Sequence, residues 1–386
     1  MRTPDPALLE RVRTGLAHQG AAVDAARVAA LLRADGRVVG DDALLALVDA
    51  LDRESVGAGP LEALLQEPGV TDVLVNGADR VYVDRGDGLE PTGVRFDDDA
   101  AVRRLAQRLA ASGGRRLDDA SPFVDVRLRD GTRLHAALAP VARPGTLLSL
   151  RVPARTVFTL DELVQRAVLP PAGARVLADL VRSRTAFLVT GGTGTGKTTL
   201  LAALLSRVSP AERLVLVEDS AELRPDHPHV VALEARPPNV EGAGDIDLRD
   251  LVRQALRMRP DRLVVGEVRG AEVVDLLAAL NTGHEGGCST VHANSVADVP
   301  ARLEALGSTA GLDRAAVRAQ VLAGLRVVVH LRRGGDGCRR LAQVGVLSAV
   351  DGGLGCPAAL TREPGGRLAP GPAAAELERI LYGSGP

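Results

Sequence analysis

The chain has 386 residues, of which 46% are hydrophobic and 2% aromatic, and its formal net charge is −2. This length predicts two folded domains, and the apolar content excludes a disordered chain. The charge gives no overall basic excess for binding nucleic acid, and the three cysteines form no C-x-x-C pair, which argues against a disulfide framework and a zinc site.

Residues 1–55 are expected to form an N-terminal helical segment, because apolar residues recur at helical spacing over 7–53 with breaks at Gly36 and Gly40. The segment begins MRTPDPALLERVRTG, which lacks the apolar core of a signal peptide. No later stretch offers 18 uninterrupted apolar residues. We therefore expect a cytoplasmic protein whose membrane association is peripheral.

Residues 56–152 are expected to form a smaller α+β domain. Apolar and polar residues alternate on both sides of Asn76-Gly77, which predicts a β-hairpin. Residues 99–112 have helical spacing, and residues 122–152 are typical of short strands. The Pro-containing residues 153–171 are expected to be a linker.

Residues 172–386 are expected to form an α/β domain with a mainly parallel sheet, followed by a C-terminal extension. Its buried strands are predicted at 186–190, 213–217, 262–266, 288–292 and 326–332. Helices are predicted to start near 197, 247, 271, 298 and 313. Beyond Gly334 we expect one strand pair near 340–348 and a short helix around Leu377.

A glycine-rich loop joins the first of these strands to a helix, in the sequence AFLVT-GGTGTGKTT-LLAALL. Glycines allow consecutive N–H groups to turn toward phosphates, and the helix N-terminus adds positive potential. Lys197, the only lysine of the chain, would bridge the β- and γ-phosphates of ATP, and Thr198 would bind Mg²⁺. The predicted nucleotide-binding residues are Gly191, Gly192, Thr193, Gly194, Thr195, Gly196, Lys197, Thr198 and Thr199.

Acidic residues follow two other strands of the predicted sheet. Glu218, Asp219 and Glu222 come after 213–217 and are candidates for holding Mg²⁺ or ordering water, with N-capping of a helix as the alternative. In RLVVGE, Gly266 stands where many P-loop enzymes have a magnesium-binding aspartate. Glu267 therefore becomes the main acidic group, able to orient or deprotonate the attacking water.

Histidines and arginines complete the candidate site. His284 and His292 lie in TGHEGGCSTVHAN. They would sense the γ-phosphate or connect the sites of two subunits, and the alternative is a purely structural role. Their spacing of eight residues is poor evidence for zinc. Arginine neutralises phosphate charge in phosphoryl transfer, often from a neighbouring domain or subunit. The arginines considered for this role, each also plausible as a solvated surface residue, are Arg127, Arg133, Arg151 and Arg269.

From about Pro60 to about Leu347 the chain resembles the type II/IV secretion ATPase superfamily, and within it the CpaF/TadA branch of tight-adherence pilus ATPases. The resemblance rests on GVTDVLVNG, FVDVRLRDGTRL, GGTGTGKTTLL, EDSAEL, LRMRPDRLVVGEVRG and TGHEGGCSTVHAN. It implies a RecA-like fold, and it implies that the residue at Glu267 is catalytic although the aspartate is missing. Residues 1–55 and the tail after 350 carry no motif of this family.

The resemblance also implies a homo-hexamer docked on inner-membrane platform proteins at the cytoplasmic face, where ATP hydrolysis drives pilin or protein extrusion. It implies that Arg133 and Arg151 close over the γ-phosphate. Two other classes remain open. A nucleic-acid motor of a conjugation-type system is disfavoured by the few aromatic residues and the charge; a non-hydrolysing scaffold is disfavoured by the intact Lys197, Thr198 and Glu267.

Overall fold

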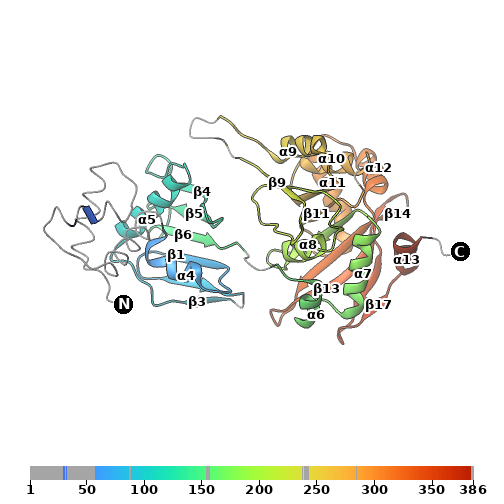
Figure 1. Cartoon of the computed structure of the whole chain (residues 1–386), viewed down its shortest axis with the longest axis horizontal. Coiled ribbons are helices and arrows are strands. Elements are labelled where there is room, and N and C mark those ends of the chain that lie inside the picture. The colour runs from blue at the N-terminus through green and yellow to red at the C-terminus, as the bar shows by residue number, and fades with distance from the viewer. Residues whose placement is uncertain are drawn as a thin grey trace. The chain divides into compact units, whose positions relative to one another are not determined.

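The computed structural model describes residues 29–30, 32, 57–86, 88–153, 157–236, 238, 243–283 and 285–383. Contacts between Cα atoms divide the chain into two compact units, Met1–Pro153 and Ala154–Pro386. Of residues 1–56 only three are described, so the helices predicted over 7–53 lie outside the described residues. Figure 1 shows the described helices and strands of each unit.

In the described part of the first unit, six antiparallel strands form one sheet in the order β3-β2-β1-β6-β5-β4. The hairpin predicted around Asn76-Gly77 is confirmed, because β1 and β2 pair antiparallel on either side of it. The strands predicted over 122–152 are confirmed as well. The strands are β1 (Asp72–Asn76), β2 (Val81–Asp84), β3 (Leu89–Pro91), β4 (Phe123–Arg127), β5 (Arg133–Ala137) and β6 (Leu147–Arg151).

Helix α5 (Asp99–Ser112) packs on one face of this sheet and matches the predicted range. Its N-cap is Asp98, whose side chain accepts a hydrogen bond from the N–H of Ala101. Alternate strand residues join the apolar face of α5 in one core, together with η1 (Gly59–Leu61) and α4 (Glu62–Gln66). The opposite face of the sheet carries the intervening polar residues, as expected for a sheet covered on one side.

In the described part of the second unit, nine strands form one sheet in the order β17-β16-β13-β12-β7-β11-β10-β8-β9. The six strands from β12 to β9 are parallel, so the predicted parallel sheet is confirmed. All five predicted strands are present, and each begins within one residue of its predicted start. The parallel strands are β7 (Phe187–Thr190), β8 (Leu214–Glu218), β9 (Val230–Glu234), β10 (Arg262–Val268), β11 (Cys288–Val291) and β12 (Val327–Arg333).

Helices cover both faces of this sheet and bury its strands, whose residues are almost continuously apolar (Figure 1). One face packs against α6 (Leu160–Gln165), α7 (Pro171–Arg182), α8 (Lys197–Leu205) and α13 (Ala374–Tyr382). The other packs against α9 (Leu248–Ala255), α10 (Glu272–Leu280), α11 (Val299–Thr309) and α12 (Arg314–Gly324). Short 3₁₀ turns are η2 (Leu256–Met258) and η3 (Val296–Asp298). Helix α6, which falls within the range expected to be a linker, begins with a capping box at Thr159 and Glu162.

The tail after Gly334 extends the main sheet. The prediction of one strand pair near 340–348 is wrong: β13 (Arg339–Val346) is one long strand that pairs with β12 on one side and β16 (Ala358–Arg362) on the other. β17 (Leu368–Pro370) forms the edge, and β14 (Ser348–Val350) pairs with β15 (Gly353–Gly355) as a separate hairpin. The terminal helix around Leu377 is confirmed as α13. Antiparallel strands need only short connections, so Gly- and Pro-rich turns here do not end the sheet.

Candidate functional site

The glycine-rich loop connects β7 to α8 at the carboxyl edge of the parallel strands. Gly191, Gly194 and Gly196 have φ angles of 152°, 70° and 91°. A Cβ on Gly191 would lie 2.5 Å from the carbonyl oxygen of Leu331, so only glycine fits between β7 and β12. Helix α8 begins directly at Lys197. The loop thus places a helix N-terminus where phosphate groups would bind.

Lys197 is folded back onto this loop. Its Nζ donates hydrogen bonds to the carbonyl oxygens of Gly191 and Gly192, at 3.1 and 2.9 Å, and its exposed fraction is 8%. Burial lowers the pKa of Lys197, and the charge of Glu267 acts in the opposite direction. A buried ammonium held by neutral carbonyls would gain from a phosphate in their place.

Around Lys197 the structure assembles residues from the carboxyl ends of two strands, β10 and β11. His292, directly after β11, places Nε2 3.5 Å from Nζ of Lys197 and 2.5 Å from Oε1 of Glu267 on β10. Arg269 forms an ion pair with the other oxygen of Glu267 through Nη2. Glu267 Oε1 is buried, and His292 Nε2 is its close polar neighbour.

The surroundings of His292 favour its neutral imidazole form. Burial lowers the pKa of His292, and the positive charge of Lys197 lowers it further, against the opposing charge of Glu267. A neutral imidazole between an ammonium and a carboxylate can accept one proton or donate one. The second predicted histidine, His284, lies outside the described residues.

The acidic segment after β8 divides into a buried and an exposed part. Glu218, the last residue of β8, is 4% exposed, and its Oε1 accepts hydrogen bonds from the N–H groups of Glu222 and Leu223, both at 3.0 Å. Asp219 and Glu222 are exposed. Glu218 therefore shapes the turn that presents the other two carboxylates.

Packing against Glu218 explains why glycine, and not the expected aspartate, occupies position 266. A Cβ there would lie 2.7 Å from Cγ of Glu218, so the Glu218 side chain fills the volume that a larger residue at 266 would need. Oε2 of Glu218 is buried without a hydrogen-bond partner. A carboxylate is thus present beside Gly266, supplied by the neighbouring strand.

The residues proposed for Mg²⁺ do not form a closed cage. Among the described residues, no group of three or more His, Cys, Asp or Glu side chains is placed to hold a metal ion. Mg²⁺ in nucleotide sites usually takes one or two protein ligands and completes its shell with phosphate and water. The side-chain oxygens of Thr190 and Glu218 that have no hydrogen-bond partner lie at the ends of β7 and β8. The ligands expected from the sequence, Thr198, Asp219, Glu222 and Glu267, belong to the same edge of the sheet.

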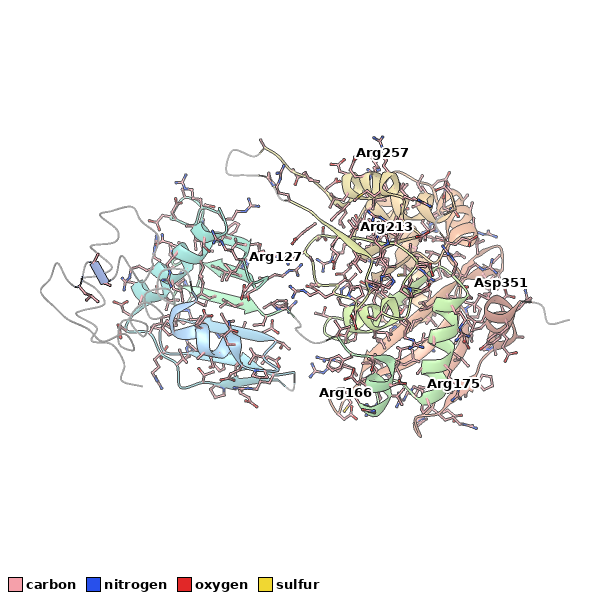
Figure 2. All side chains as sticks on the ribbon, viewed as in Figure 1. Arg127, Arg166, Arg175, Arg213, Arg257 and Asp351 are labelled. Atoms are coloured by element: carbon pink, nitrogen blue, oxygen red, sulfur yellow. The ribbon has the colours of Figure 1, made fainter. Side chains whose placement is uncertain are left out.

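The three candidate arginines of the first unit form one row. Arg127 pairs with Arg133 across β4 and β5, and Arg133 pairs with Arg151 across β5 and β6. They lie on the face opposite α5, and Figure 2 shows Arg127 at the end of β4. Arg151 also forms an ion pair with Asp72, at 3.0 Å. Like charges on adjacent strands destabilise a sheet. A surface that binds an anion would explain why the arginines of this row are kept together.

One contact was missed by the sequence reasoning. Arg339, the first residue of β13, donates from Nε to the carbonyl oxygen of Gly194, at 2.8 Å. It therefore holds the tip of the glycine-rich loop. None of the quoted motifs includes Arg339, and the contact depends on β13 pairing beside β12.

Within the described parts of the chain, no helix has the length and apolarity needed to span a membrane. A sequence profile of the family described as "Type II/IV secretion system protein" matches residues 54–369. Two putative conjugal transfer proteins of Mycobacterium tuberculosis are each 58% identical over 321 residues, which cover 82% of this chain and 91% of theirs. Conjugal transfer protein TrbB of Rhizobium radiobacter is 30% identical over 284 residues, covering 72% of this chain and 84% of its own.

Solved structures of related shape agree with the fold. The pilus retraction motor PilT with bound ADP has a TM-score of 0.50 at 21% identity, over 81% of this chain and 82% of its own. The ATPase DotB of Yersinia pseudotuberculosis has a TM-score of 0.54 at 17% identity, over 78% of this chain and 80% of its own. At these identities the likeness shows the fold alone: a RecA-like α/β domain with a smaller N-terminal domain.

Proposed function

The chain belongs to the type II/IV secretion system protein family, and from that premise we propose that it is an ATP-hydrolysing motor of the tight-adherence (CpaF/TadA) pilus type. The observation that carries the hydrolytic part is the contact series from Lys197 through His292 to Glu267 beside the glycine-rich loop. A binding module would need the loop and its lysine. It would not need a half-buried glutamate in contact with a histidine and an arginine at the same edge.

In the proposed reaction, the phosphates of ATP lie along residues 191–199 and replace the two carbonyl oxygens as partners of Lys197. Mg²⁺ would neutralise phosphate charge, held by Thr198 with Asp219, Glu222 and Glu267 in the ligand shell or one water away. Glu267 orients a water molecule and accepts its proton. The water oxygen bonds to the γ-phosphorus while the bond to the β–γ bridging oxygen breaks, which yields ADP and phosphate.

His292 and Arg269 would position Glu267 for this step. Each contacts one of its two oxygens, so the carboxylate is held from both sides. The arginine row of the first unit, Arg133 and Arg151 in particular, would supply positive charge to the γ-phosphate within the chain or from a neighbouring subunit. The like-charged register of the row supports this role.

The proposed assembly is a homo-hexamer at the cytoplasmic face of the membrane, docked on inner-membrane platform proteins. In it, ATP-driven domain movement would extrude pilin or protein. Size-exclusion chromatography with light scattering, with and without ATP, tests the hexamer. Direct contact with nucleic acid is not part of this proposal.

A second candidate is a nucleic-acid-translocating motor of a conjugation-type system. The observation that favours it is the naming of the 58% and 30% identical relatives as conjugal transfer proteins. Stimulation of ATP hydrolysis by DNA would support this candidate. Stimulation by a platform protein, without any response to DNA, would support the pilus motor.

The decisive experiment for hydrolysis compares the wild-type chain with Glu267→Gln. We expect ATP binding to be retained and steady-state hydrolysis to fall by roughly 10²-fold or more, because the base for the attacking water is lost. Glu304→Gln, which changes a carboxylate on α11 that pairs with Arg314, is the matched control. Equal hydrolysis by Glu267→Gln and wild type would leave only the binding or scaffold function.

A further inference from the structure

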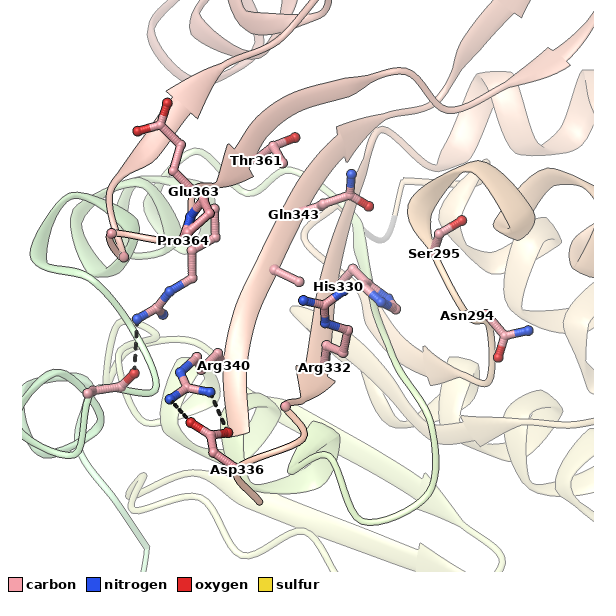
Figure 3. Close-up of a pocket in the computed structure, with 16 residues that line it drawn as sticks. Asn294, Ser295, His330, Arg332, Asp336, Arg340, Gln343, Thr361, Glu363 and Pro364 are labelled. Atoms are coloured by element: carbon pink, nitrogen blue, oxygen red, sulfur yellow. Dashed lines mark hydrogen bonds and ion pairs between the residues drawn. The ribbon is translucent and has the colours of Figure 1, made fainter. Parts of the chain in front are cut away.

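The second unit contains a cavity of about 760 Å³ over the carboxyl end of β12 and the adjoining strands β13 and β16 (Figure 3). Its floor is a face of the sheet, and Asn294 and Ser295, which follow β11, line one side. The described residues that line it include neither the glycine-rich loop nor Glu267. The cavity therefore has its own lining, although it adjoins the nucleotide site: His330 pairs across β12 and β7 with Thr190, the residue before Gly191.

Three arginines from neighbouring strands line this cavity: Arg332 on β12, Arg340 on β13 and Arg362 at the end of β16. Arg332 and Arg340 are direct partners in the antiparallel register. Like charges in directly opposed positions destabilise a sheet. The sequence nevertheless places two such charges opposite each other here, so an acidic partner or a bound anion is needed to offset each of them.

The carboxylates of the cavity do not balance these charges. Asp336 forms a two-pronged ion pair with Arg340, at 2.8 and 2.5 Å. Glu363 forms its ion pair with Arg367, a residue outside the cavity lining. The side chain of Arg332 makes no ion pair or hydrogen bond with another described residue. Two of the three guanidinium groups therefore have no acidic partner.

Arg362 is one of the two arginines without an acidic partner. Its guanidinium donates only to two backbone carbonyl oxygens, those of Val168 and Ala167, at 3.3 and 3.4 Å. Burial lowers the pKa of Arg362, and the positive charge of Arg340 lowers it further. Arg362 thus has backbone carbonyls as partners but no carboxylate to offset its charge.

Polar residues continue the same face of the sheet. His330, Gln343 and Thr361 occupy directly paired positions on β12, β13 and β16 and line the cavity. His330 is 3% exposed, and its Nδ1 is buried without a hydrogen-bond partner. Figure 3 shows His330 and Arg332 side by side on β12. The cavity therefore combines two uncompensated cations with a row of hydrogen-bonding side chains.

We propose that this cavity is a second binding site, for a small molecule that carries phosphate or carboxylate groups with at least two negative charges. The planar guanidinium groups of Arg332 and Arg362 would each bind an oxyanion through two parallel hydrogen bonds. Gln343 and Thr361 would contact the uncharged part of the ligand. A volume of about 760 Å³ lies within the usual range for small-molecule sites.

The test measures binding to the full-length Lys197→Ala chain, in which the nucleotide loop has lost its ammonium. Isothermal titration calorimetry without Mg²⁺ uses pyrophosphate as the phosphate probe and citrate as the carboxylate probe. We expect at least one probe to bind, and Arg332→Gln and Arg362→Gln to weaken that probe at least tenfold. The probe that binds identifies which oxyanion the site accepts.

The matched control is Arg333→Gln, which changes the next residue of β12 on the opposite side of the strand and should alter affinity less than twofold. Arg332→Gln removes a like charge from an exposed position, so its thermal unfolding midpoint should equal or exceed that of the parent. Failure of both probes to bind, or equal binding by Arg332→Gln, overturns the proposal. If Arg332→Gln instead dissociates an oligomer and no probe binds, the cavity is a contact between copies, which also overturns it.

Discussion

Gly266 and Glu218 lie side by side on adjacent parallel strands, and Cγ of Glu218 lies 2.7 Å from the position that a Cβ on residue 266 would occupy. The absence of an aspartate at 266 and the presence of a buried glutamate at 218 are therefore one structural feature. A carboxylate is retained at this point of the sheet edge, but β8 carries it and β10 makes room for it.

Gly266→Ala should destabilise the chain by about 1–3 kcal/mol, because the added methyl group overpacks the site of Glu218. The same substitution in a Glu218→Ala background should cost much less, since the clashing Cγ is gone. Urea denaturation of the four chains of this double-mutant cycle gives the coupling free energy. Simple additivity would show that the two side-chain positions do not compete for space.

Glu218 should make stability depend on pH. Burial raises its pKa from an ordinary value of 4.5 to about 7, with the charges of Glu222 and Glu234 acting in the same direction against two backbone donors. The folded chain then binds this proton more tightly than the unfolded chain. The resulting stabilisation is full below pH 4.5 and is lost as the pH rises through 7, with a magnitude on the order of 3 kcal/mol.

Glu218→Gln mimics the protonated side chain and keeps its oxygen as an acceptor for Glu222 and Leu223. The variant should match wild type in unfolding free energy at pH 4.5 and exceed it above pH 7. Denaturation of the nucleotide-free chains at half-unit pH intervals measures the difference. A difference that is flat across this range contradicts the buried, proton-binding state of Glu218.

Lys197→Ala should abolish detectable ATP binding, because the loop then offers only neutral N–H groups to the triphosphate. Lys197→Arg should also bind weakly, since a planar guanidinium does not fit between the carbonyl oxygens of Gly191 and Gly192. Fluorescent ATP-analogue titration measures both. If Lys197→Ala bound the ATP analogue as tightly as wild type, the proposed ATPase function would be contradicted.

Arg339→Gln should loosen the glycine-rich loop, because the hydrogen bond from Nε to the Gly194 carbonyl is lost. We expect KM for ATP to rise about three- to tenfold with kcat nearly unchanged, as for a residue that organises binding rather than chemistry. Arg367→Gln, on the exposed turn between β16 and β17, serves as control. A fall in kcat at constant KM would assign Arg339 to the chemical step instead.

The sequence predicted the structure correctly where that structure depends on contiguous residues. A buried strand, a glycine-rich turn and a helix starting at Lys197 are contiguous, so their order alone predicts the phosphate loop. The strand and helix positions of the second unit followed from apolar periodicity for the same reason. The antiparallel strands of the tail were underestimated, because β16 and β17 are short and lie among Gly and Pro residues.

By itself the sequence therefore determined the type of domain, the loop that would hold phosphate and the acidic and basic residues available near it. Only the tertiary structure decided which of them meet: His292 with Lys197 and Glu267, Arg339 with Gly194, and Glu218 with Gly266. The physical reason is the order of parallel strands. Local spacing fixes where each strand begins and ends, but the packing of crossover helices on both faces decides which strands become neighbours.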